Sequence, residues 1–445
     1  MNSITASRIF RLAFPLILQQ LCLQLQLWID RAMLGHVNAE FFSAIGNTTI
    51  PYQMVVSVII AICGGTTILV AQNIGAKDLS RVTEVTEASF IGNSLLSVLA
   101  FLFFLVFSDE LFEIMGVQDQ ILGYSISYIR ILSLSMLILG PSATATAVLQ
   151  GLGFTKIIMI SGILGNIVNI FLDWILIYGR LGLPALGIEG AAMATVIANF
   201  LSAPLTILFV LKHSKMPIKP RLFSSPLRGL RNYGQVLALG IPSGLEYGLW
   251  NAGNLVLVSY LNRLDMLSAG IYTLVFSIET VPLMIYMGFA NAGLTLVGQE
   301  IGANDPKQAK RAGFLCLLFS LVICAVTAVT FRLFPRPILT VFTDDISILD
   351  ISVPYLKFVA WILLPKAVNN VIGLCIRGMG DTRWMLFTQI FGTAFMVFGG
   401  YWLILGTELG LAGIFVTLLA DESLRGVANL IRFSTAGRRN IPVRS

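Results

Sequence analysis

Two acidic residues lie inside long apolar stretches of the sequence, each with amide side chains at helical spacing. Asp173 follows Asn169 by four residues and Asn166 by seven, and Asp30 follows Gln26 by four. Residues with these separations project from one face of a helix. Each carboxyl group would therefore share its helix face with amide oxygens.

This set of side chains predicts ion or proton coupling. Hard cations take carboxylate, amide and hydroxyl oxygens as ligands, and two closely spaced carboxylates could instead hold one proton between them. We expect coupling at Asp30, Asn169, Asp173, Thr195, Gln26 and Asn166, and a bound Na⁺ would lie at Asp30, Asn169 and Asp173. The alternative is that these polar groups only join neighbouring helices. Arg31 either pairs with Asp30 and keeps it ionised or reaches the membrane interface. The second reading is favoured, because on a helix Arg31 points about 100° away from Asp30.

The elements that would position these residues are membrane-spanning helices. Only 12% of the 445 residues are charged and 56% are hydrophobic, whereas a soluble domain carries about 25% charged residues. A span needs about 20 predominantly apolar residues. The sequence predicts twelve spans, at 11–34, 44–72, 88–107, 124–150, 157–178, 187–211, 234–261, 268–299, 311–333, 352–376, 384–405 and 410–432.

The basic residues give the expected orientation. Most of the 29 Lys and Arg fall on the side that carries both termini and the connection between the halves. The positive-inside rule places that side in the cytoplasm. The net charge of +6 is therefore read as an orientation signal and not as a nucleic-acid site. The five cysteines lie in apolar segments without CxxC spacing, so neither a disulfide framework nor a zinc site is predicted.

The chain is an internal duplication. Residues 69–78, LVAQNIGAKD, recur as LVGQEIGAND at 296–305, an offset of 227, and the same offset takes Pro15 onto Pro242. The glycines and charges of these two segments predict turns and helix caps. Each half has six helices, so the repeats are parallel and related by a pseudo-two-fold axis along the membrane normal, as in transporters that work by alternating access. The expected domains are an amino-terminal lobe (1–212), a basic cytoplasmic linker (213–232), a carboxy-terminal lobe (233–434) and a cytoplasmic tail (435–445).

The repeat also provides an internal comparison for the acidic cluster. At the offset of 227, Asp30 falls on Leu257, Asn169 on Met396 and Asp173 on Gly400. The ionisable residues of the second half are Glu246, Glu279 and Lys366. They either form structural ion pairs or, together with Asn251, line a substrate cavity. In the last span, Asp421, Glu422 and Arg425 are expected to form a structural network. We find no nucleotide-binding loop, and His36 and His213 have no HExxH spacing, so an enzyme is not predicted.

The sequence resembles the multidrug and toxic compound extrusion (MATE) family over almost its whole length. The resemblance lies in Phe14-Pro15 with Ile29-Asp30 and Leu34-Gly35, in 71–76, in 150–153 and in 190–195. Asn169-x-x-x-Asp173 together with Asp30 is similar to the site of the DNA-damage-inducible F (DinF-like) branch. Gln26 stands where that family often has Tyr, and Arg31 replaces a small residue. Asn251 stands where the NorM-like branch has an acid.

The resemblance implies a twelve-helix fold in two six-helix lobes and a secondary active efflux transporter. Its substrates would be amphiphilic, cationic small molecules exchanged for H⁺ or Na⁺, with no other cofactor. We expect a monomeric, multi-pass protein of the bacterial inner membrane that contacts lipid and no nucleic acid. The alternative is a flippase for a lipid-linked or anionic substrate, for which Lys366 is the one intramembrane residue in favour.

Overall fold

The protein is helical throughout the part that is described. The computed structural model describes residues 5–35, 39–220 and 226–435, and no β-strand occurs in these ranges. Their helices are α1 (Ala6–Gly35), α2 (Ala39–Gly75), α3 (Leu79–Ile114), α4 (Asp119–Ser133), α5 (Met136–Leu152), α6 (Thr155–Tyr178), α7 (Gly187–Lys212), α8 (Pro226–Leu264), α9 (Ser268–Gly302), α10 (Pro306–Leu333), α11 (Pro335–Leu339), α12 (Ile346–Gly378), α13 (Thr382–Leu405) and α14 (Leu411–Thr435).

The all-α fold with twelve predicted spans is confirmed, with α4 and α5 together standing for one of them. Nine helices of the described ranges are long and apolar enough to cross a membrane, and the α4–α5 pair makes ten. The other two predicted spans correspond to α8 and α14, which do not meet this criterion of length and hydropathy. The short helix α11, between α10 and α12, was not predicted.

The predicted span 124–150 is not straight. The chain bends by 46° between α4 and α5. At the bend, Leu134 N and Ser135 N still donate to carbonyls three residues earlier, both at 3.0 Å. The Ser135 hydroxyl lies 2.6 Å from the Tyr52 hydroxyl of α2. The break therefore leaves these amides paired, which is why an apolar segment tolerates it.

The duplicated segments after α2 and α9 form turns and helix caps, as their glycines and charges predict. Lys77 and Asn304 both adopt left-handed backbone angles, with φ of 61° and 57°. The carboxylate of Asp78 then accepts the amide of Arg81 at 2.9 Å, and Asp305 accepts that of Gln308 at 3.0 Å. Each aspartate thus satisfies one amide that the first helical turn leaves unpaired.

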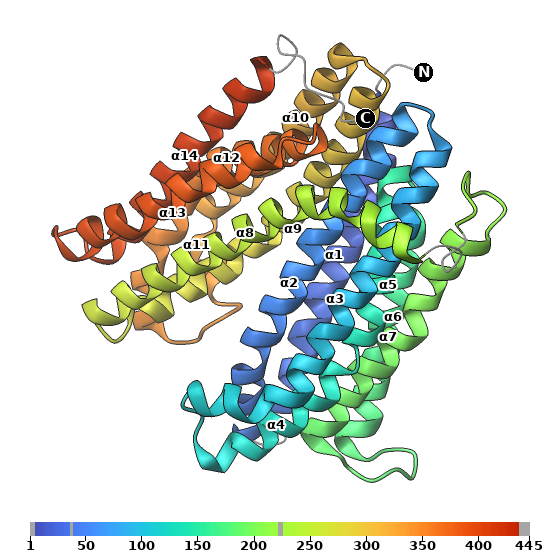
Figure 1. Ribbon diagram of the computed structural model, residues 1–445. Helices are drawn as coiled ribbons and strands as arrows, with labels where there is room; N and C mark the ends of the chain where they lie inside the picture. The colour runs from blue at the N-terminus through green and yellow to red at the C-terminus, as the bar shows by residue number, and fades with distance from the viewer. Residues whose placement is uncertain (1–4, 36–38, 221–225, 436–445) are drawn as a thin grey trace. The chain divides into compact units, whose positions relative to one another are not determined.

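The chain packs as two compact units. The amino unit is Leu18–Gly244, and the carboxy unit is Leu245–Ser445 together with Met1–Ile17. Figure 1 shows α6 and α7 running side by side in the amino unit, and in the carboxy unit α12 packs along both α9 and α14. Ile17 and Gly244, the last residues before the two divisions, are one repeat offset apart.

The two units differ in extent from the expected lobes, because α1 and α8 each contribute to both units. In the carboxy unit, Arg8 of α1 donates to Gln299 at 2.8 Å and to Glu300 at 3.2 Å. In the amino unit, Tyr233 of α8 donates to Asn93 at 2.6 Å. The expected lobe boundaries at 212 and 233 follow the sequence repeat, whereas the two packed units divide within α1 and within α8. The expected linker and tail lie partly outside the described residues, as does His36.

Candidate ion-coupling site

The predicted amino-terminal cluster comes together in the amino unit from three helices. Gln26 Nε2 of α1 donates to Asn169 Oδ1 of α6 and lies 3.5 Å from Asp30 Oδ2. Asn169 Nδ2 donates to Thr195 Oγ1 of α7 at 3.4 Å. Asp173 is 1% exposed and Asn169 is also 1% exposed. The i, i+4 spacing thus places these groups on one buried polar surface, as the sequence predicts.

The carboxyl groups of Asp30 and Asp173 lie within hydrogen-bonding reach of each other. Taken as carboxylates, both oxygens of Asp173 and Oδ1 of Asp30 are buried without a hydrogen-bond donor in the described part of the chain. No salt bridge joins either group to a side chain that the structure describes. A buried carboxylate without a partner is strongly disfavoured. Among the described residues, only a proton or a cation would offset the charge of such a pair.

Two other residues bear on this cluster. Asn166 lies one turn before Asn169, and its Nδ2 is buried without a hydrogen-bond partner among the described groups. Asn166 is thus not joined to the cluster directly. The backbone of Arg31 is helical, but its side chain lies outside what the structure describes, so its expected direction stays a prediction.

The repeat positions in the carboxy unit form an apolar contact instead. Leu257 and Met396 are both fully buried. Gly400 packs so closely on Leu257 that a Cβ at position 400 would overlap the Leu257 side chain. The residues equivalent to Asp30 and Asp173 thus also meet, but through hydrocarbon. Packing of the fold does not require a polar cluster at this place.

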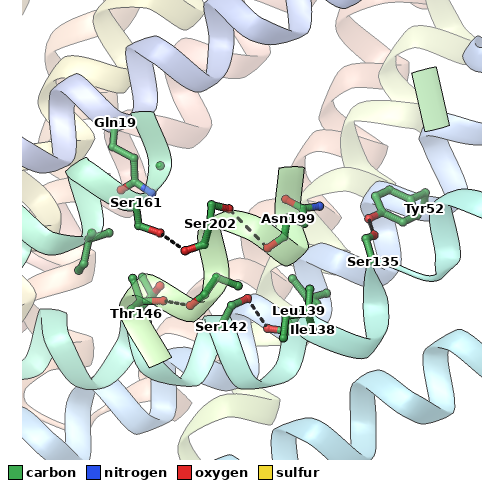
Figure 2. A pocket seen from close by; sticks show the side chains of 14 residues that line it. Gln19, Tyr52, Ser135, Ile138, Leu139, Ser142, Thr146, Ser161, Asn199 and Ser202 are labelled. Atoms are coloured by element: carbon green, nitrogen blue, oxygen red, sulfur yellow. Dashed lines mark hydrogen bonds between the residues drawn. The ribbon is translucent and has the colours of Figure 1, made fainter. Parts of the chain in front are cut away.

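A small polar pocket lies in the amino unit beside the cluster. Its volume is about 160 Å³, and it is lined by side chains of α1, α2, α5, α6 and α7 and by Ser135 before α5. Figure 2 shows Ser161 donating to the backbone oxygen of Ser202, at 2.8 Å. None of its lining residues is charged. Sequence reasoning missed this pocket, although Ser142 and Thr146 on α5 and Ser202 and Thr206 on α7 repeat at helical spacing.

The ionisable residues of the carboxy unit form ion pairs. Lys366 Nζ of α12 lies 2.8 Å from Glu279 Oε1 of α9, and their side chains are 7% and 5% exposed. Glu246 Oε2 of α8 lies 2.7 Å from Arg377 Nη2 of α12. Asn251 is exposed and donates to its own helix at Tyr247 O, at 2.9 Å. Glu246, Glu279 and Lys366 thus form ion pairs, as one of the two sequence readings expected, and the substrate-cavity reading stays a prediction.

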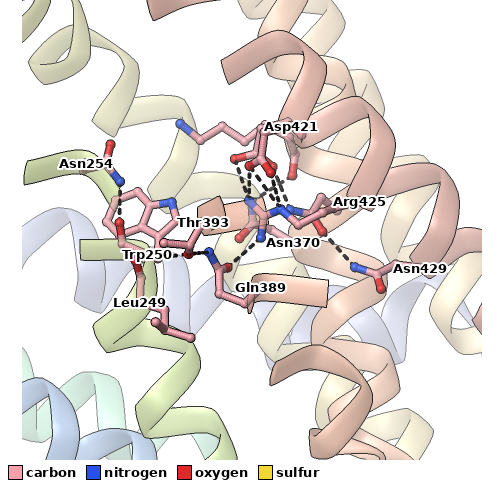
Figure 3. Close-up of polar contacts among 12 residues, drawn as sticks. Leu249, Trp250, Asn254, Asn370, Gln389, Thr393, Asp421, Arg425 and Asn429 are labelled. Carbon is pink, nitrogen blue, oxygen red and sulfur yellow. Dashed lines mark hydrogen bonds and ion pairs between the residues drawn. The ribbon is translucent and has the colours of Figure 1, made fainter. Parts of the chain in front are cut away.

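The charges of α14 belong to a second polar network, shown in Figure 3. Arg425 lies 2.5 Å from Asp421 and donates to Gln389 of α13 at 2.6 Å. Glu422 accepts from Asn369 of α12 at 2.7 Å, and its distance from Arg425 is 3.8 Å. The structural role expected for these three residues is confirmed by these contacts. Their partners on α12 and α13 were not predicted, because nothing in the spacing links helices so far apart in sequence.

The duplicated all-helical fold, with helices apolar enough to cross a membrane and a buried polar site inside them, defines a multi-pass membrane transporter. The sequence profile of the MatE family matches residues 15–175 and 242–402, two stretches one repeat offset apart. The chain therefore belongs to the MatE family, as the resemblance implied. Members of this family are transporters, so the expectation that the chain is not an enzyme is confirmed.

Similar proteins support this assignment over nearly the full length. The chain is 25% identical to a probable multidrug resistance protein NorM of Thermotoga maritima, over 96% of this chain and 91% of that one. It is 26% identical to the uncharacterized transporter YisQ of Bacillus subtilis, over 94% and 92%. An outward-facing multidrug resistance MATE family transporter of the MOP superfamily has a TM-score of 0.89 at 22% identity, covering 96% of both chains. At that identity the structure shows the fold alone.

Proposed function

We propose that this protein is a multidrug efflux antiporter that exports amphiphilic, cationic small molecules in exchange for H⁺ or Na⁺. One observation carries the coupling part of the proposal. The carboxyl groups of the half-buried Asp30 and the buried Asp173 lie within hydrogen-bonding reach in the amino unit, with no salt bridge to a described side chain. Such a pair gains a proton or a cation readily and releases it when its surroundings change, which is what coupling requires.

The roles within the site follow from the contacts. Asp30 and Asp173 would hold the ion, and Asn169 would offer its amide oxygen to a metal ion once Gln26 moves off it. Thr195 fixes the other end of the Asn169 amide. A proton needs only the carboxyl pair, whereas Na⁺ needs further oxygens. The Asn169-x-x-x-Asp173 arrangement also supports a place near the DinF-like branch.

Helix α1 offers a physical link between ion binding and the conformational change. It carries Gln26 and Asp30 in the amino unit, and its first turns, anchored by Arg8, belong to the carboxy unit. An ion drives a conformational change only through its different affinity for the two states. One charge crossing about 100 mV supplies about 2.3 kcal/mol, which corresponds to roughly a fifty-fold substrate gradient.

The experiment is transport of a fluorescent cation in proteoliposomes, with Na⁺ and pH gradients imposed separately. We expect Asp30→Asn and Asp173→Asn to abolish gradient-driven transport at equal reconstitution. Asp109→Asn is the matched control, because Asp109 lies in the same unit in a half-exposed pair with Arg130 at 2.9 Å. Near-normal transport by both site variants would rule the proposal out. The gradient that drives the wild type identifies the ion.

The ion pair of Lys366 counts against the flippase alternative. Lys366 was the one intramembrane cation in its favour, and Glu279 neutralises it at 2.8 Å. A role of Glu246, Glu279 or Lys366 in substrate binding would require these pairs to open. We further propose that the side with the basic loops is cytoplasmic and that the protein works as a monomer. Labelling of engineered cysteines from each side tests the orientation, and light scattering in detergent tests the oligomeric state.

A further inference from the structure

The polar pocket of the amino unit has no role in the coupling reaction as described so far. It lies between α1, α2, α5, α6 and α7, near the beginning of α6 and in the second half of α7, the two helix ends that adjoin the basic loops. Its side chains offer hydroxyl and amide groups without charge, among them Gln19, Ser142, Thr146, Asn199 and Ser202 (Figure 2). Polar walls of this kind hold water.

The pocket stands in a fixed relation to the carboxyl pair. On three helices a pocket residue precedes or follows a cluster residue by seven positions, namely Gln19 and Gln26, Gly162 and Asn169, and Ser202 and Thr195. Seven residues of helix span about 10 Å. On each helix that builds the cluster, the pocket therefore has a residue two helical turns from it, on the same side of the cluster.

The interval between them is also polar. Asn199 lines the pocket and lies one turn from Thr195, and Asn166 lies between Gly162 and Asn169. Asn166 Nδ2 is a buried donor without a partner among the described residues. A buried amide in that state needs a partner. A water molecule or a passing ion between the pocket and the cluster would provide one.

The volume of the pocket decides what it can hold. About 160 Å³ is room for several waters at about 30 Å³ each. Drug-sized ligands occupy sites of about 300–1,000 Å³. The pocket thus fits water and a small monovalent cation and does not fit an amphiphilic drug.

The repeat shows that the fold does not require this space. At the offset of 227, Gln19, Ser142 and Gly162 correspond to Glu246, Asn369 and Gln389. For α7 and α14 the offset is 223, because Gly190 packs on Leu176 as Gly413 packs on Leu403, and it takes Ser202 onto Arg425. In the carboxy unit these positions hold the paired ionic network (Figure 3).

We propose that the pocket is the hydrated passage through which the coupling cation, a proton or Na⁺, leaves the carboxyl pair toward the cytoplasmic side. Uncharged oxygen dipoles solvate a monovalent cation without trapping it, whereas the charged network of the carboxy unit would bind or repel it. The passage rests on the proposed coupling at Asp30 and Asp173. The proposal adds a path for the ion, and the residues that line this path, to the proposed coupling site.

The first test is the accessibility of Ser202→Cys in the folded transporter. Cys22 is replaced by Ala to remove the one partly exposed native cysteine, since Cys63, Cys316, Cys324 and Cys375 are buried. The probe is a small, membrane-impermeant, cationic thiol reagent. Leu201→Cys is the matched control, because Leu201 is the neighbouring residue on the exposed face, 58% exposed. We expect Ser202→Cys to be modified from the side of the basic loops and Leu201→Cys to resist a reagent confined to water.

The second test compares transport of the same sample before and after modification, so folding is not in question. Blocking the passage should lower ion-driven transport about tenfold or more and leave equilibrium binding of the fluorescent cation within about twofold. Loss of substrate binding together with transport would overturn the proposal, since the pocket would then hold substrate. Absence of modification, or transport that persists after complete modification, would also overturn it. If Asp30→Asn and Asp173→Asn keep coupled transport, the proposed function itself fails, and that outcome is separate from these.

Discussion

The buried ion pair of Lys366 and Glu279 should make single replacements costly and a paired replacement nearly neutral. The two groups are 2.8 Å apart with side chains 7% and 5% exposed. Lys366→Met leaves Glu279 as a buried charge without its partner, which costs about 3–5 kcal/mol. Lys366 Nζ also lies 5.4 Å from the centroid of the Phe276 ring. Losing this cation–π contact adds about 0.5–1 kcal/mol to the cost of the replacement. Combining Lys366→Met with Glu279→Gln should bring stability back to within about 1 kcal/mol of the wild type.

The measurement is a double-mutant cycle on the free energy of unfolding in detergent. The control is Asp350→Asn, which breaks the exposed pair of Asp350 with Arg336 and should cost less than about 1 kcal/mol. Equal costs for Lys366→Met and Asp350→Asn, or a coupling energy near zero, would refute the assignment of a buried pair.

The remaining predictions concern packing and a helix cap. Gly140→Ala should lower stability by about 1–3 kcal/mol, because a Cβ there would overlap the backbone carbonyl of Asn93. Gly123→Ala, in α4 with open space around the new methyl group, should instead raise stability by about 0.5–1 kcal/mol; the same change for both in thermal unfolding would contradict this. Asp265→Ala should cost about 1 kcal/mol at neutral pH, because its carboxylate accepts the Ser268 amide at 2.7 Å and the Ser268 hydroxyl at 2.6 Å. These bonds lower the pKa of Asp265, chiefly through the Ser268 hydroxyl, so the contribution is present above the ordinary aspartate pKa and is lost as the pH falls. A pH-independent difference between Asp265→Ala and wild type would count against the cap.

The elements and the amino-terminal cluster could be predicted because both depend on local spacing. Apolar length gives a span, and the i, i+4 relation of Asn169 and Asp173 gives one face of a helix wherever that helix packs. The bend between α4 and α5 could not be predicted, since the residues around Ser135 carry no glycine or proline at the break. Its hydroxyl contact with Tyr52 comes from 83 residues away.

The pairing of charges in the carboxy unit could not be predicted from the sequence for a different reason. Glu246, Glu279, Lys366 and Arg377 lie on three helices, and several pairings neutralise the charge equally well. Only packing selects Glu246 with Arg377 and Glu279 with Lys366. The division of α1 and α8 between the two units could not be predicted for the same reason. An apolar pattern predicts a helix, but it does not predict which residues each turn of that helix contacts.

Comparison of the two repeats separates what the fold needs from what coupling needs. Where the amino unit has Asp30 facing Asp173, the carboxy unit has Leu257 packed on Gly400. Where the amino unit has an uncharged pocket, the carboxy unit has a network anchored by Arg425. Both arrangements fill equivalent places in equivalent helices, so neither is dictated by the architecture. A polar pair without a salt bridge, next to a space that water can fill, destabilises a folded unit unless it binds something. The proposed coupling accounts for this difference, because the amino unit would then hold and release an ion, whereas the carboxy unit keeps its charges in ion pairs.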